Sequence, residues 1–182
     1  AELASKLGRE KESSRWKTRA DKLYDGLMRE LWRGDHFVAR LGLDGTDVES
    51  QSLIPWLPVI LGKRLPVEVR VALKAGIETH LTRWGLATER VDSPFYKTDG
   101  YWRGPIWAPS TFLAVTGLDR CGFTALADTI AERFCRLCAQ SGFAENFDAV
   151  TGAPLCDPAY TWTASVFLLL AERMKKRKKR KE

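Results

Sequence analysis

Three segments of the chain carry apolar residues at three- and four-residue spacing, with charged residues between them. They are residues 16–34, 66–85 and 123–142. This spacing places the apolar side chains on one face of a helix and the charged side chains on the other. We therefore predict three amphipathic helices, each with one face in contact with solvent.

Three further segments are apolar nearly all round, and they alternate along the chain with the amphipathic ones. They are residues 48–62, 105–118 and 160–171. A helix of that composition is buried on most of its sides, and a repeat of about 50 residues is typical of helical arrays. We therefore predict an all-α fold of about six helices that alternate between an outer and an inner ring, as in an α/α toroid. Only residues 36–42 could pair briefly as a strand.

The links between these predicted helices differ in length. The links that lead from an amphipathic helix to an apolar one are long, and they comprise residues 34–47, 86–104 and 143–159. In a toroid these long loops emerge at one end, and long loops on a rigid scaffold commonly carry function. The sequence YWRGPIW (Tyr101 to Trp107) ends one such loop, and Glu145 lies in the next. Aromatic rings beside a carboxylate suit sugars, because rings stack on C–H faces while hydroxyls bind charged groups.

The formal charge of +6 is concentrated in the sequence KKRKKRK, residues 175–181. Without residues 175–182 the chain has as many basic as acidic residues, so no basic face for nucleic acid is expected. We predict one domain over residues 1–174 and a basic, disordered tail over residues 175–182, whose removal would leave stability unchanged.

Four cysteines are too few to indicate a disulfide scaffold in a chain of 182 residues. Cys135 and Cys138 form a CxxC inside a predicted helix, where core thiols are expected rather than metal ligands. No cofactor and no metal are predicted. Because no apolar run is long enough for a membrane span and the N-terminal residues are charged, a soluble, cytoplasmic protein without a membrane partner is expected.

Three motifs occur in a characteristic order: YWRGPIW, then GFAENFDAVTG (Gly142 to Gly152), then DPAYTWTAS (Asp157 to Ser165). At these residues the chain resembles glycoside hydrolase family 63 and its bacterial relatives, the mannosylglycerate and glucosylglycerate hydrolases, which are related to trehalases and amylo-α-1,6-glucosidases. The resemblance covers residues 15–174. It implies an (α/α)6 barrel of twelve helices that hydrolyses α-glucosides or α-mannosides with inversion, using one carboxylic acid and one carboxylate base. Six predicted helices would then correspond to the C-terminal half of this catalytic domain.

The resemblance also assigns roles to individual residues. Glu145 matches the general base of the family, and Tyr101, Trp102 and Trp107 match its sugar-binding aromatic residues. The family's catalytic acid is an Asp in the first half of the barrel, so we expect it in a missing N-terminal half and expect this chain alone to be inactive. Four more residues of the long loops and the last helix are candidates for substrate binding: Arg103, Glu89, Tyr160 and Trp162.

Other interpretations of the same residues stay open. Glu145 could be a solvated loop carboxylate, Arg103 could brace its loop, and the Trp residues could be core anchors. The main alternative function is a non-catalytic helical array that binds a saccharide or a peptide in its groove. A sugar epimerase or isomerase ranks lower, because it would need histidine at the mouth and only His36 lies in a long loop. In the favoured interpretation the partner is a carbohydrate substrate.

Overall fold

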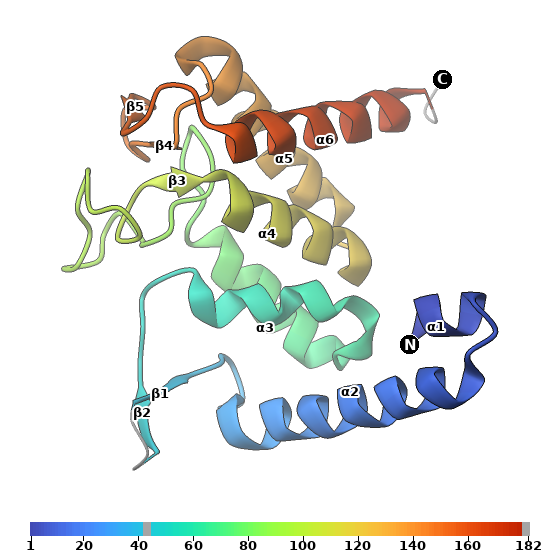
Figure 1. The fold of residues 1–182 in the computed structure, drawn as a ribbon. Helices are drawn as coiled ribbons and strands as arrows, with labels where there is room; N and C mark the ends of the chain where they lie inside the picture. The colour runs from blue at the N-terminus through green and yellow to red at the C-terminus, as the bar shows by residue number, and fades with distance from the viewer. Residues whose placement is uncertain (42–44, 180–182) are drawn as a thin grey trace. The chain divides into compact units, whose positions relative to one another are not determined.

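Helices predominate in the computed structural model, which describes residues 1–41 and 45–179 (Figure 1). The chain divides into two units, one formed by residues 1–49 and the other beginning at Ser50. Among the described residues, no helix is both long enough and apolar enough to cross a membrane.

The first unit contains the first amphipathic helix that the sequence predicts. A short helix α1 (Glu2–Lys6) precedes the long helix α2 (Glu10–Leu31). Two short strands follow, β1 (Ala39–Leu41) and β2 (Thr46–Val48), and they pair antiparallel with Ala39 opposite Val48. The brief strand expected within residues 36–42 is therefore present over residues 39–41.

The second unit begins with η1 (Ile54–Arg64), a 3₁₀ helix where the sequence predicts a buried helix over residues 48–62. Pro55 lies in its first turn, and Pro58 lies inside it and has no backbone N–H to donate to the preceding turn. At Gly62 the backbone leaves the helical conformation, with φ at +62°. The segment therefore forms the tighter helix in place of a regular α-helix, and it starts later than predicted.

The remaining helices follow the sequence pattern closely. They are α3 (Val67–Glu78), α4 (Ala108–Cys121), α5 (Thr124–Ser141) and α6 (Thr161–Lys178). The main difference is that α3 ends well before Gly85. The Thr82 hydroxyl accepts hydrogen bonds from the N–H groups of Trp84 and Gly85, and such local bonds compete with the helical ladder.

Helix α4 lies at the centre of the second unit and packs against η1, α5 and α6, while α3 packs against η1. Two glycines permit the close approach of η1. A Cβ on Gly76 would lie 2.3 Å from the Trp56 ring, and one on Gly117 would lie 2.6 Å from Val59. Because side chains cannot occupy that space, both positions need glycine.

The sequence predicts that the apolar helices are buried on most sides. This prediction is confirmed for α4 and is wrong for α6. Most residues of α4 are buried. On α6, by contrast, Leu168 is 66% exposed and Leu169 is 50% exposed. The helices that pack on α6 are α4 and α5, and they cover only part of its apolar circumference.

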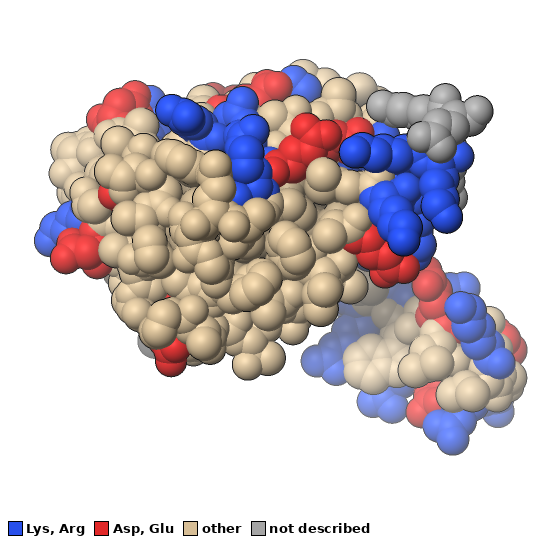
Figure 2. Space-filling model, turned by 90° about the horizontal axis from the view of Figure 1, so that it is seen from above, with Lys and Arg blue, Asp and Glu red and all other residues tan. Residues whose placement is uncertain are grey.

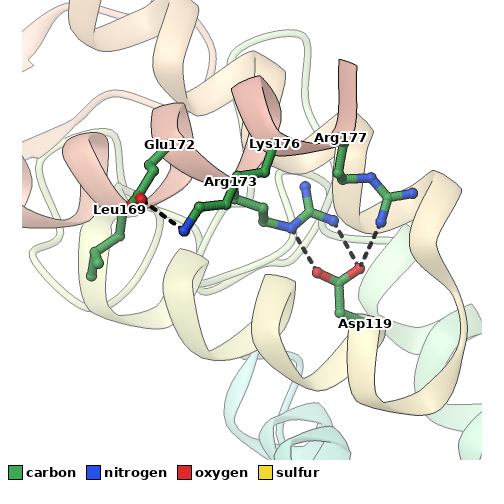
Figure 3. A pocket seen from close by; sticks show the side chains of 6 residues that line it. All are labelled: Asp119, Leu169, Glu172, Arg173, Lys176 and Arg177. Carbon is green, nitrogen blue, oxygen red and sulfur yellow. Dashed lines mark hydrogen bonds and ion pairs between the residues drawn. The ribbon is translucent and has the colours of Figure 1, made fainter. Parts of the chain in front are cut away.

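The prediction of a disordered tail is wrong for residues 175–178, which form the last turn of α6. Arg173 Nε and Nη2 donate to the two carboxylate oxygens of Asp119 at 2.6 and 2.8 Å. One turn later, Arg177 also faces Asp119, as Figure 3 shows. Its Nε lies 2.9 Å from Asp128 on α5. These ion pairs hold the part of the helix that runs into the basic sequence. In Figure 2, Lys and Arg side chains gather on one side of the molecule, next to acidic ones. Residues 180–182 of the predicted tail lie outside the described residues.

We therefore expect Arg177→Gln to lower the free energy of unfolding by about 1 kcal/mol, since partly buried ion pairs contribute at most roughly this much. Lys176→Gln is the matched control, because Lys176 is mostly exposed and pairs with Glu172 on the same helix. Urea unfolding of both variants measures the difference. Equal stability of the two variants would show that the Arg177 contacts contribute nothing.

Candidate functional site

A three-stranded antiparallel sheet joins two of the sequence motifs. Its strands are β3 (Ile106–Trp107), β4 (Asn146–Phe147) and β5 (Pro154–Leu155), in the order β3-β4-β5. Ile106 pairs with Phe147, and Trp107 pairs with Asn146. The sheet thus brings the end of YWRGPIW against the centre of GFAENFDAVTG, as Figure 1 shows for β3 and β4.

Glu145 directly precedes β4 and is held through its backbone. Its N–H donates to the carbonyl oxygen of Asp157 at 2.7 Å, and its own carbonyl oxygen accepts from Trp162 Nε1 at 3.3 Å. The buried hydroxyl of Thr163 donates to the neighbouring carbonyl of Ala144 at 2.7 Å. These contacts from the start of α6 fix the position of the Glu145 main chain.

The Glu145 carboxylate is half-buried and accepts a hydrogen bond from the Tyr101 hydroxyl, with 2.8 Å between Oη and Oε1. The sequence-based prediction that Tyr101 and Glu145 lie together is confirmed. The pKa of Tyr101 is raised, mainly by this hydrogen bond. The hydroxyl therefore stays protonated at neutral pH and remains a donor to the carboxylate.

Tyr101 has a backbone conformation that is unusual for a residue with a side chain, with φ at +58°. Such a left-handed conformation is costly and persists only where the surroundings impose it. The Trp107 indole N–H donates to the Tyr101 carbonyl oxygen at 2.8 Å. This bond, together with the one to Glu145, holds the loop in a form that points the hydroxyl at the carboxylate.

Five aromatic side chains cluster beside Glu145. The rings of Trp102 and Trp107 are stacked, with centroids 4.0 Å apart and planes 12° apart. Tyr101 and Trp162 meet the Trp107 ring edge-on at 4.7 and 5.3 Å, and Tyr160 lies 4.8 Å from Trp162. Trp107 is fully buried, whereas Trp102 and Tyr101 are each 47% exposed. Trp107 is therefore the buried residue on which the other rings pack, and Trp102 exposes part of its side chain to solvent.

Two predicted substrate-binding residues have contacts of their own. Arg103 is exposed and stacks over the Phe95 ring at 5.6 Å, so it braces the loop. Glu89 is only 4% exposed, and its carboxylate accepts a hydrogen bond from Ser93 at 2.6 Å. A role for either residue in sugar binding stays a prediction.

The sequence analysis missed two residues next to Glu145. Asn146 is buried on β4, and its amide Nδ2 donates to the Cys156 sulfur at 3.5 Å. No sequence signal brings Cys156 to this place, because strands of two residues are too short to show an alternating pattern.

The CxxC cysteines lie on α5, as the helical pattern predicts. Burial raises the pKa of the Cys135 thiol to about 11 and that of Cys138 to about 12. Both are therefore protonated at neutral pH and poor metal ligands or nucleophiles. Within the part of the chain that the structure describes, no three His, Cys, Asp or Glu side chains are grouped to hold a metal ion.

Comparisons with known proteins find relatives of this chain. The mannosylglycerate hydrolase from Rubrobacter radiotolerans is 31% identical over 179 residues, which is 92% of this chain and 39% of that protein. The glucosylglycerate hydrolase from Mycolicibacterium hassiacum is 34% identical over 68 residues, 37% of this chain and 15% of that protein. The chain thus spans well under half the length of the relatives that it matches.

The fold has counterparts among solved structures as well. The crystal structure of a GH63 mannosylglycerate hydrolase from Thermus thermophilus, in complex with glucose, superposes with a TM-score of 0.78 at 24% identity, over 92% of this chain and 40% of that one. At that identity the superposition shows a shared fold. The model of the mannosylglycerate hydrolase MGH1-like glycoside hydrolase domain matches residues 1–163. The chain therefore belongs to the MGH1-like family of glycoside hydrolase domains.

Proposed function

We propose that this chain is part of a glycoside hydrolase that cleaves mannosylglycerate or glucosylglycerate with inversion, and that Glu145 is its general base. The observation that carries the proposal is the Glu145 carboxylate, held by the Tyr101 hydroxyl at 2.8 Å beside the aromatic cluster. Family membership supplies the reaction class.

The contacts of Glu145 suit the task of a base. Oε1 is occupied by the Tyr101 hydroxyl, so the second oxygen is left to take a proton from a water molecule. In an inverting enzyme that water attacks the sugar on the face opposite the leaving group, and the two carboxyl groups stand about 6.5–9.5 Å apart to admit it. Hydrogen bonds of the Glu145 backbone with Asp157 and Trp162 fix the main chain from which the carboxylate extends.

Trp102 is the side chain best placed to bind the sugar. One face of its ring is stacked on the buried Trp107, which holds it rigid, and the residue is still 47% exposed. A flat, preorganised aromatic surface binds the C–H face of a pyranose with little loss of conformational freedom.

The general acid is proposed to lie in the part of the catalytic domain that has no counterpart in this chain. The chain covers 39% of the Rubrobacter relative, which leaves room for further helices. The exposed Leu168 and Leu169 of α6 would pack against those helices, because apolar patches on soluble proteins commonly mark such contacts. The chain would then be the C-terminal half of an (α/α)6 barrel.

The alternative function is a non-catalytic helical array that binds a saccharide or a peptide. An ion pair that neutralised the Glu145 carboxylate would favour this alternative. None of the ion pairs among the described residues involves Glu145, whose partner is a neutral hydroxyl. A free, oriented carboxylate favours the hydrolase.

Complementation tests the proposal. We expect the purified 182-residue chain alone to leave mannosylglycerate intact, and we expect turnover after it is co-expressed with the part of the Rubrobacter relative that precedes the matched region. That part alone is the control. The anomer that forms first, followed by NMR, should be the inverted one. Turnover by the isolated chain would place the acid within it, and a retained anomer would rule out the proposed role of Glu145 as a base.

A further inference from the structure

Cys156 lies across from Glu145 at an irregularity in the small sheet. The ladder pairs Asn146 with Leu155, yet the next bond joins the N–H of Glu145 to the carbonyl oxygen of Asp157. Two residues, Cys156 and Asp157, therefore oppose the single Glu145, as in a β-bulge. Cys156 has φ at +60° and is exposed.

Asn146 is a second, independent feature of this place. Its side chain is 1% exposed, and its Nδ2 lies 3.5 Å from the Cys156 sulfur. The Oδ1 atom of the same amide is buried and has no hydrogen-bond partner. Buried polar atoms nearly always have partners. Oδ1 and Nδ2 share one carbon, so this unpaired acceptor belongs to the same amide group that already contacts the sulfur, and a hydroxyl bonded to sulfur could satisfy it.

We propose that Cys156 is a site of reversible oxidation by hydroperoxides, and that Asn146 stabilises the sulfenic acid formed there. The Cys156 thiolate attacks one peroxide oxygen, a sulfur–oxygen bond forms, and the oxygen–oxygen bond breaks. The sulfur loses two electrons to the peroxide, whose other oxygen leaves as hydroxide (or as an alkoxide from an organic hydroperoxide) and takes up a proton. The new S–O–H group donates its hydrogen to Asn146 Oδ1.

The other cysteines are poor competitors for this reaction. Burial raises the pKa of the Cys121, Cys135 and Cys138 thiols, which keeps them protonated, whereas the thiolate is the reacting form. Cys156 alone of the four is exposed. Its side-chain partner is an amide and not a second thiol, so the sulfenic acid has no neighbouring cysteine with which to condense.

The consequence for catalysis rests on the proposed function. A hydroxylated sulfur at the bulge opposite Glu145 adds a polar group next to the path of the attacking water. Oxidation of Cys156 would then slow turnover, and reduction by a small thiol would restore it.

Trapping with a 1,3-dicarbonyl reagent tests the site on the 182-residue chain itself. After hydrogen peroxide treatment, peptide mass spectrometry should find the adduct at Cys156. Cys156→Ser should lose the adduct, while the matched control Cys135→Ser should retain it. Adducts chiefly at another cysteine, or none at all, would overturn the proposal.

A delayed addition of the trap tests the part played by Asn146. The sulfenic acid of the folded chain should persist and remain trappable, whereas in Asn146→Leu it should be lost to further oxidation. Peroxide-treated chain unfolded in urea is a second comparison that does not depend on the variant folding. If the sulfenic acid had the same lifetime in the folded and the unfolded chain, the proposal that Asn146 stabilises it would be wrong.

The trapping experiment needs no hydrolysis, so its outcome is independent of the proposed function. In the complemented enzyme, peroxide should lower the hydrolysis of mannosylglycerate, and a thiol reductant should restore it. Cys156→Ser should be insensitive to peroxide. Fully active enzyme that carries the sulfenic acid would overturn the regulatory consequence.

Discussion

Glu145→Gln is expected to remove most of the turnover of the complemented enzyme while leaving its fold and sugar binding in place. Glutamine has nearly the same shape and can still accept the Tyr101 hydrogen bond, but it cannot take the proton of the attacking water. General-base catalysis contributes about 10²–10⁴-fold, so a loss of kcat of that size is expected. KM should change little, because the missing interaction belongs mainly to the transition state.

Asp99→Asn is a suitable control for this experiment, because Asp99 is an exposed carboxylate of the loop that carries Tyr101. It should keep kcat near that of the unaltered enzyme. Azide, a small nucleophile that needs no base, should partly restore the Glu145→Gln variant on an activated substrate. A variant with kcat near that of the parent would make Glu145 an ordinary loop carboxylate.

Acid is expected to destabilise the second unit through His80. The side chain is 1% exposed, its Nδ1 lies 3.1 Å from the Ala87 carbonyl oxygen, and its buried Nε2 has no hydrogen-bond partner. Burial lowers the pKa of His80 from 6.5 to about 4, and the Arg90 cation adds to the effect. In the folded chain His80 therefore stays neutral at a pH where the unfolded chain already binds a proton.

The sign of the effect follows from proton binding. Well above pH 6.5 both states are neutral at this residue, and its titration has no effect on stability. As the pH falls from 6.5 towards 4, the unfolded state gains a proton that the folded state does not bind, so the free energy of unfolding falls. A pKa difference of this size corresponds to a loss of about 3 kcal/mol.

Urea unfolding at about pH 7 and about pH 4.5 measures this loss, and the comparison with His80→Gln isolates it from the titration of carboxylates. The variant should lose less stability than the parent between the two pH values. His36→Gln is the matched control, since His36 is the other histidine of the chain and lies in the first unit against Asp35. Identical pH dependence of the parent and His80→Gln would show that His80 is not the titrating group.

The same residue shows how hydrogen bonds of a local turn escape sequence analysis. His80 follows the end of α3, and its partner Ala87 lies beyond a turn that is closed by Thr82 and Gly85. The apolar pattern through this region predicts one long helix. A hydroxyl that bonds to the backbone can end a helix without altering that pattern.

The amino-acid pattern and the resemblance that it carries were sufficient to predict where most helices lie, that α4 is buried and α5 amphipathic, and that Tyr101 and Glu145 lie close together. These features follow from spacing within a single segment and from the order of three motifs, so they need no knowledge of which segments meet. The folded chain was needed to show that Trp107 is the buried residue on which the aromatic cluster packs and that Cys156 lies opposite Glu145. It was also needed to show that Arg177, at the end of α6, pairs with Asp128 of α5. Each of these depends on a contact between residues brought together by folding, made through strands of two residues or through ion pairs between helices. Such contacts leave no periodic trace in the chain, because their geometry exists only once the loops and helices have packed.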